Sequence, residues 1–119
     1  MRATEANFEG GTPVDGYGPG AFRVGGAVHR GPLALLPSGV VAWSGPPDWA
    51  PLLERASEFD VLLVGSGVEM APPEGFAAVR SALEANGAGA EFMSTPSAAR
   101  TYNVLLAEGR RVAAALVPV

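Results

Sequence analysis

Two short polar stretches in this chain follow apolar runs, and their residue types suit the binding of a small anion. If the two runs are neighbouring parallel strands, their carboxyl ends meet at the same edge of a sheet, where open α/β folds bind ligands. Free N–H groups at the start of a following helix would face that edge and suit a phosphate or carboxylate. We therefore expect a candidate ligand site formed by Gly65, Ser66, Gly67, Ser94 and Thr95, with Arg100 one to two turns into the helix. Arg100 could reach toward this edge or point to solvent.

The pattern is weak as a nucleotide signature. Gly65-Ser66-Gly67 is not the dinucleotide fingerprint, because Met70 stands where the third glycine belongs. The Gly-Lys-Ser/Thr ending of a phosphate loop is also missing. Glycine after a buried strand most often lets the chain turn, so the ordinary interpretation of this stretch is a turn.

Other residues give little reason to expect catalysis or metal binding. The chain has no cysteine and one histidine, His29, and a lone histidine is more often a surface or hydrogen-bonded residue than a catalyst. The carboxylates are spread over expected helix faces and loops. We therefore expect no catalytic residue, no metal site and no cofactor.

The stretch 94–109 predicts an amphipathic helix, with Pro96 in its first turn and Gly109 at its end. Ala99, Tyr102, Leu105 and Leu106 are spaced to face a sheet, while Arg100 and Asn103 share another face. One interpretation is structural: Asn103 or Thr101 bonds a neighbouring loop, and Glu108 pairs with Arg110 or Arg111. The other is that Arg100 and Asn103 contact a partner protein.

Short apolar pieces separated by glycine and proline fill residues 14–43 and indicate a β meander. Gly25-Gly26 predicts one hairpin turn and Pro37-Ser38-Gly39 a second. Residues 1–12 are expected to be a weakly held start. Trp43 and Trp49 flank a proline-rich turn, and we expect them to pack the first helix onto the sheet.

From Asp48 onward the pattern alternates between helix and strand. Asp48 could cap a helix that has Pro51 in its first turn, and Pro72-Pro73 is expected to open a second helix, which Asn86-Gly87 ends. The runs 60–64, 89–93 and 111–117 predict buried strands. The fold class that follows is α/β: a single domain over residues 1–119, with a central mixed sheet, about three helices and an N-terminal antiparallel β portion.

Charge and composition exclude several classes of partner. The 119 residues carry a formal net charge of −4, and all eight basic residues are arginines, scattered apart from Arg110-Arg111. Such a chain is a poor match for a nucleic-acid backbone or an anionic lipid surface. No apolar run approaches the roughly 18 residues of a membrane span, and the first residues show no secretory signal. We therefore expect a cytoplasmic protein.

Three motifs in order carry a resemblance to a known family. "GYGPGAFRVGG", "LLVGSG" and "MSTPSAARTYNVLLAEGRRVAAALVPV" resemble the family catalogued as domain of unknown function 498, from about Val14 to Pro118. Its relatives include a mitochondrial assembly factor for respiratory complex I and an adipogenesis-associated protein. The resemblance implies one α/β domain with a mixed sheet and an assembly or interaction role, without catalytic residues. Ser94 and Ser97 depart from the acid and the small residue of many relatives.

The first hypothesis is therefore a non-enzymatic protein-interaction module that assists assembly of a larger complex, possibly a respiratory or other membrane-associated one. The alternative is a small-anion-binding protein or an enzyme that uses the edge at Gly65–Gly67 and Ser94–Thr95. A third possibility is a homodimer formed through the N-terminal β portion.

Overall fold

The computed structural model describes residues 10–119, so the expectation of a weakly held start at 1–12 falls largely outside the described residues. The described part forms eight strands, three α-helices and one 3-10 turn. In chain order these are β1 (Val14–Gly18), β2 (Ala21–Val24), β3 (Ala27–Arg30), β4 (Leu33–Leu36), β5 (Gly39–Ala42), α1 (Ala50–Leu53), the 3-10 turn (Ala56–Glu58), β6 (Val61–Ser66), α2 (Phe76–Ala85), β7 (Gly89–Met93), α3 (Thr95–Ala107) and β8 (Val112–Val117).

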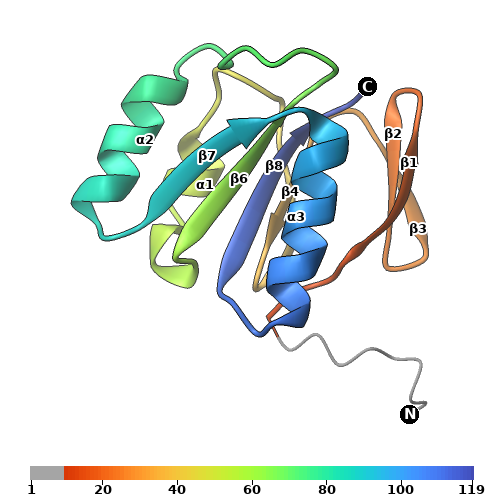
Figure 1. Cartoon of the computed structure of the whole chain (residues 1–119), viewed down its shortest axis with the longest axis horizontal. Helices are drawn as coiled ribbons and strands as arrows, with labels where there is room; N and C mark the ends of the chain where they lie inside the picture. Colours follow the sequence, from red (N-terminus) through yellow and green to blue (C-terminus); the bar gives the residue numbers. More distant parts are fainter. Residues whose placement is uncertain (1–9) are drawn as a thin grey trace.

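A five-stranded mixed sheet in the order β5-β4-β8-β6-β7 forms the centre of the molecule. β6 pairs in parallel with both β7 and β8, whereas β4 pairs antiparallel with β8 and with β5. The chain crosses from β6 to β7 through α2, then back past β6 to β8 through α3. Because such crossovers are right-handed and these two run in opposite directions across the sheet, α2 and α3 cover opposite faces (Figure 1).

Both faces of this sheet are buried, which explains the continuous apolar runs of its central strands. Alternate side chains of each strand enter different clusters: Leu62 and Val64 pack on the α1 and α2 side. Leu63 packs on the α3 side. The tryptophans confirm the packing expected of them, since Trp43 and Trp49 are both buried with ring centroids 5.5 Å apart.

The N-terminal strands form a separate three-stranded antiparallel sheet, β1-β2-β3. Its Phe22 and Val24 join the core on the α3 side, and Figure 1 shows this sheet standing beside α3. The Gly25-Gly26 hairpin is confirmed. The expectation of one continuous meander is wrong, because β4 and β5 leave it to extend the central sheet.

Two helix starts also differ from expectation. α1 begins after Trp49 rather than Asp48 and has only four residues. α2 begins after Gly75, whose φ of 82° is left-handed, so Pro72 and Pro73 lie in the loop before the helix. The α/β class, the mixed sheet and the antiparallel N-terminal portion are confirmed.

Candidate functional site

The expected ligand edge lies where the topology changes direction. β6 and β7 are parallel neighbours, and Gly65 pairs with Met93 at their carboxyl ends. The chain leaves β6 toward α2 on one face and leaves β7 toward α3 on the other. This is a topological switch point, the place where open α/β sheets most often have a binding crevice.

The side chain of Thr95 fills that position. Thr95 is fully buried, and its Oγ1 donates to the Val117 carbonyl at 2.5 Å and accepts the Gly67 N–H at 2.8 Å. The Thr95 N–H in turn donates to the Gly67 carbonyl at 2.8 Å. Two N–H groups expected to meet an anion are therefore bonded within the protein.

Gly65 and Ser66 are explained by the same packing. A Cβ on Gly65 would lie 2.8 Å from Thr95 Oγ1 and 2.9 Å from Thr95 Cα, so this glycine allows the start of α3 to approach β6. Both residues belong to β6 itself, not to a turn after it. Ser66 Oγ lies 2.5 Å from the Glu69 carbonyl and 3.0 Å from the Met93 carbonyl. The six candidate ligand residues stay a prediction, and a ligand here would have to displace these bonds.

Ser94 and Arg100 both lie near the side chain of Ser97 in the first turn of α3. Ser94 occupies the N-cap position without a side-chain capping bond, and its Oγ lies 3.2 Å from Ser97 Oγ. Arg100 is exposed, and its Nη2 lies 3.4 Å from the same Ser97 hydroxyl. Arg100 is thus placed on the outer surface of α3, and its contact with a partner stays a prediction.

Asn103 holds the first strand of the small sheet. Its Oδ1 accepts the Val14 N–H at 2.8 Å, and its Nδ2 donates to the Val14 carbonyl at 2.9 Å. Val14 is buried and 89 residues distant in the chain. This matches the structural interpretation, except that Asn103 bonds the start of β1. A contact of Asn103 with a partner protein stays a prediction.

Tyr102 secures the segment just before β1. Its ring is fully buried, and its hydroxyl donates to the Thr12 carbonyl at 2.8 Å. Burial raises the pKa of Tyr102 to about 12, because the charged phenolate would lose its hydration. Together, Tyr102 and Asn103 fasten the N-terminal sheet to α3.

The charged end of α3 uses a partner that was not foreseen. Arg111 Nη2 lies 3.5 Å from Asp60 Oδ1 and donates to the Ser57 carbonyl at 2.9 Å. This joins the entrance of β8 to the entrance of β6. Glu108 was expected to pair with Arg110 or Arg111, and Arg111 is instead paired with Asp60. The sequence carried no signal for this contact, because Asp60 and Arg111 are brought together only by the pairing of the two strands.

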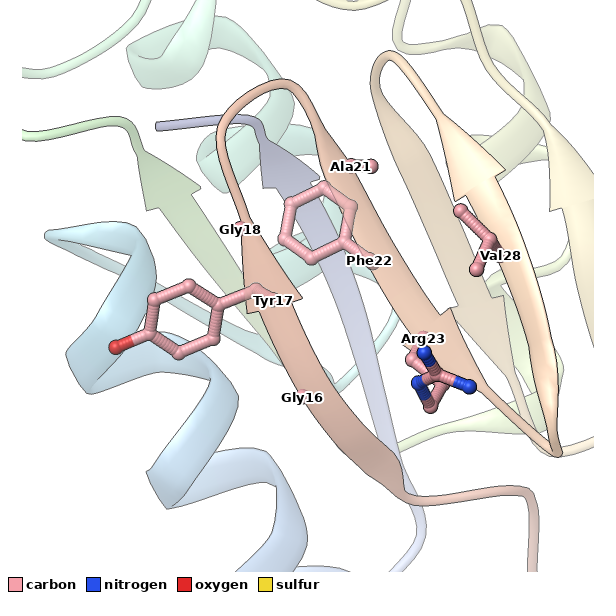
Figure 2. A pocket seen from close by; sticks show the side chains of 7 residues that line it. All are labelled: Gly16, Tyr17, Gly18, Ala21, Phe22, Arg23 and Val28. Atoms are coloured by element: carbon pink, nitrogen blue, oxygen red, sulfur yellow. The ribbon is translucent and has the colours of Figure 1, made fainter.

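A shallow hollow of about 350 Å³ lies on the small sheet (Figure 2). Its small residues are Gly16, Gly18 and Ala21, and Figure 2 shows Tyr17 on one side of it with Arg23 and Val28 on the other. Tyr17 and Val28 are 44% and 53% exposed. His29 is half-buried on β3, where it pairs with Phe22.

Two further findings concern residues 10–119 only. No three or more His, Cys, Asp or Glu residues gather there in a way that could hold a metal ion. None of the helices in this range has the length and apolar character that crossing a membrane requires.

Similar proteins support the fold and point to one named role. An uncharacterised protein of Rhodobacter capsulatus is 51% identical over 99% of this chain and 94% of its own length. The zebrafish (Danio rerio) protein named NADH dehydrogenase [ubiquinone] 1 alpha subcomplex assembly factor 3 is 32% identical over 91% of this chain. This chain spans only 65% of that assembly factor.

A solved structure agrees with the architecture over almost the whole chain. The crystal structure of a protein described as an outer membrane protein, from Bartonella henselae, superimposes with a TM-score of 0.81 at 39% identity. The match covers 95% of this chain and 99% of that one. The family model described as protein of unknown function (DUF498/DUF598) matches residues 14–117, and the chain belongs to this family.

Proposed function

We propose that this protein is a non-catalytic protein-interaction module that assists the assembly of a larger complex, of the respiratory or another membrane-associated kind. One observation carries the proposal: the 32% identity to a named NADH dehydrogenase assembly factor extends over 91% of this chain. The family model in turn matches residues 14–117, which include both sheets and all three helices, so the likeness concerns the whole unit rather than one motif.

The geometry of the switch point supports an interaction role better than a ligand-binding one. Thr95 and Gly67 bond each other there, and Gly65 leaves no room beside Thr95. The polar groups that remain accessible to a partner lie on the outer surface of the molecule. Among these, Arg100 is an exposed cation on α3 and is the proposed partner contact from that helix.

Deletion of the gene in its native host tests the role directly. We expect the deletion strain to contain less assembled NADH:ubiquinone oxidoreductase, measured as in-gel activity after native electrophoresis, and we expect the wild-type gene to restore it. Arg100→Glu should restore it less well, because a reversed charge repels the surface that an arginine attracts.

Arg110→Glu is the matched control, since it reverses the charge of another exposed arginine just beyond the same helix. A deletion strain with undiminished oxidoreductase and undiminished amounts of other membrane complexes would refute the proposed function. Equal restoration by the two variants would remove Arg100 from the partner surface.

A further inference from the structure

The loop between β6 and α2 exposes the two most solvent-accessible large hydrophobic side chains of the described residues. Val68 is 76% exposed and Met70 is 68% exposed. They lie in a run of five consecutive exposed residues, 68–72. Single apolar residues at a surface are ordinary, but two on one short loop form a patch that calls for an explanation.

Both ends of this loop are held firmly. At its start, Gly67 exchanges two hydrogen bonds with the buried Thr95. At its end, the Glu74 carbonyl accepts a 2.9 Å hydrogen bond from the indole N–H of buried Trp49. The next residue, Gly75, sits so close to that indole that a Cβ would lie 2.8 Å from its nitrogen. The apolar side chains are therefore presented from a fixed base, which lowers the entropic cost of binding.

The protein surface beside this loop carries negative charge. A hollow of about 340 Å³ there is lined by residues of the loop, among them Glu69 and Glu74, and by Ser66 and Val117 at the ends of β6 and β8. Its two charged residues are glutamates, and both are exposed. In Figure 1 this loop runs over the carboxyl ends of the parallel strands, on the same side as the end of β8.

We propose that residues 68–74 dock a segment of a partner protein that presents apolar side chains flanked by lysine or arginine. The apolar side chains cover Val68 and Met70, while the flanking cations meet Glu69 and Glu74. This inference rests on the proposed function, for which it names the surface and the chemistry of the partner.

The charges favour such a partner over two other occupants. A second copy of the chain, docked symmetrically through this loop, would bring the glutamates of both copies together, and like charges across an interface are costly. An anionic lipid surface would be repelled by the same glutamates. A basic apolar segment would bind favourably to both the apolar side chains and the glutamates of this surface.

Site-specific photocrosslinking in the native host tests the proposal. p-Benzoyl-L-phenylalanine replaces Val68 in one strain and Val104 in another; Val104 is a matched control because it is 55% exposed on α3. We expect irradiation to link position 68, and not position 104, to a partner peptide that mass spectrometry identifies as apolar with lysine or arginine close by. Crosslinks only to a second copy, to lipid or to an acidic segment would overturn the proposal.

The partner segment identified in this way is then synthesised, and its affinity is measured by fluorescence anisotropy. We expect Val68→Ser/Met70→Ser to weaken binding at least roughly tenfold, as loss of a central contact does. Glu69→Lys/Glu74→Lys should weaken it similarly and reverse its salt dependence, because the introduced lysines repel the cations of the segment and salt screens that repulsion. Val104→Ser should leave binding unchanged, and unfolding curves of all variants should match the wild type because every substituted residue is exposed.

The outcomes separate the two proposals. If deletion lowers the amount of assembled complex but position 68 links no protein, the docking surface is refuted while the assembly role stands. If position 68 links a basic apolar segment but deletion changes no complex, the surface stands and the assembly role falls.

Discussion

α3 and the β6–α2 loop place their side chains in opposite ways. On α3, the polar groups of Thr95, Tyr102 and Asn103 bond other parts of the fold. On the loop, the apolar side chains of Val68 and Met70 face water. The two regions meet where Thr95 bonds Gly67. The helix therefore holds the start of the loop in place. Polar character alone thus does not mark a binding surface, because the polar groups of Thr95, Tyr102 and Asn103 are used within the fold.

The largest effect is expected where the two regions join. Gly65→Ala would place a Cβ within 3.0 Å of Thr95 and Leu116, which forces α3 away from β6 and disturbs the hydrogen bonds of Thr95. We expect this to lower the free energy of unfolding by about 3–4 kcal/mol, combining overpacking with buried polar groups left unpaired. Urea unfolding followed by circular dichroism measures the loss.

Gly16→Ala is the control for this change, because nothing lies within 4 Å of the added Cβ although Gly16 is also a strand glycine. We expect it to change stability by less than about 0.5 kcal/mol, as surface substitutions usually do. Equal losses in the two variants would mean that the close contact of β6 and α3 does not matter for stability.

The second effect depends on pH and concerns Tyr102. Its pKa is about 12 in the folded protein and 10.0 in the reference state, so the folded state keeps a proton that the unfolded state loses above pH 10. The stabilisation is present below pH 10 and is lost as pH rises toward 12. A two-unit difference corresponds to about 2–3 kcal/mol.

Absorbance at 295 nm during alkaline titration should show one tyrosine ionising near pH 12, and urea midpoints should fall between pH 10 and 12. Tyr102→Phe should remove the late-ionising tyrosine and flatten that fall. A titration without a late-ionising tyrosine would contradict the burial of this hydroxyl.

The sequence predicted the elements of the second half better than the arrangement of the first. Continuous apolar runs and three-and-four spacing are local signals, and they correctly indicated β6, β7, β8 and α3. The split of the N-terminal strands into two sheets depends on β4 pairing with β8, some 80 residues away. No local pattern distinguishes that pairing from a continuous meander.

The candidate site shows the same limit. The chain order and the glycines correctly placed the switch point beside Gly65 and Ser94. Whether the N–H group of Gly67 is free for a ligand depends on which way one threonine side chain points, and the Thr95 hydroxyl bonds Gly67 and Val117. The exposure of Val68 and Met70 was not predicted, because nothing in the local sequence distinguishes an exposed apolar residue from a buried one.

The smallest effect separates the two regions most directly. Asn103→Ala removes both hydrogen bonds to Val14 and leaves that backbone N–H and carbonyl without their partner, so we expect a loss of about 1–2 kcal/mol. Val68→Ala removes more apolar surface, yet it should cost less than about 0.5 kcal/mol because that surface is already in water. Paired urea curves, read with amide hydrogen exchange at Val14, test both expectations.

Faster exchange at Val14 in Asn103→Ala alone would support the comparison. An unchanged Asn103→Ala curve would mean that β1 is held by its own sheet, and Asn103 would then be free to serve a partner, as its place on α3 had first suggested.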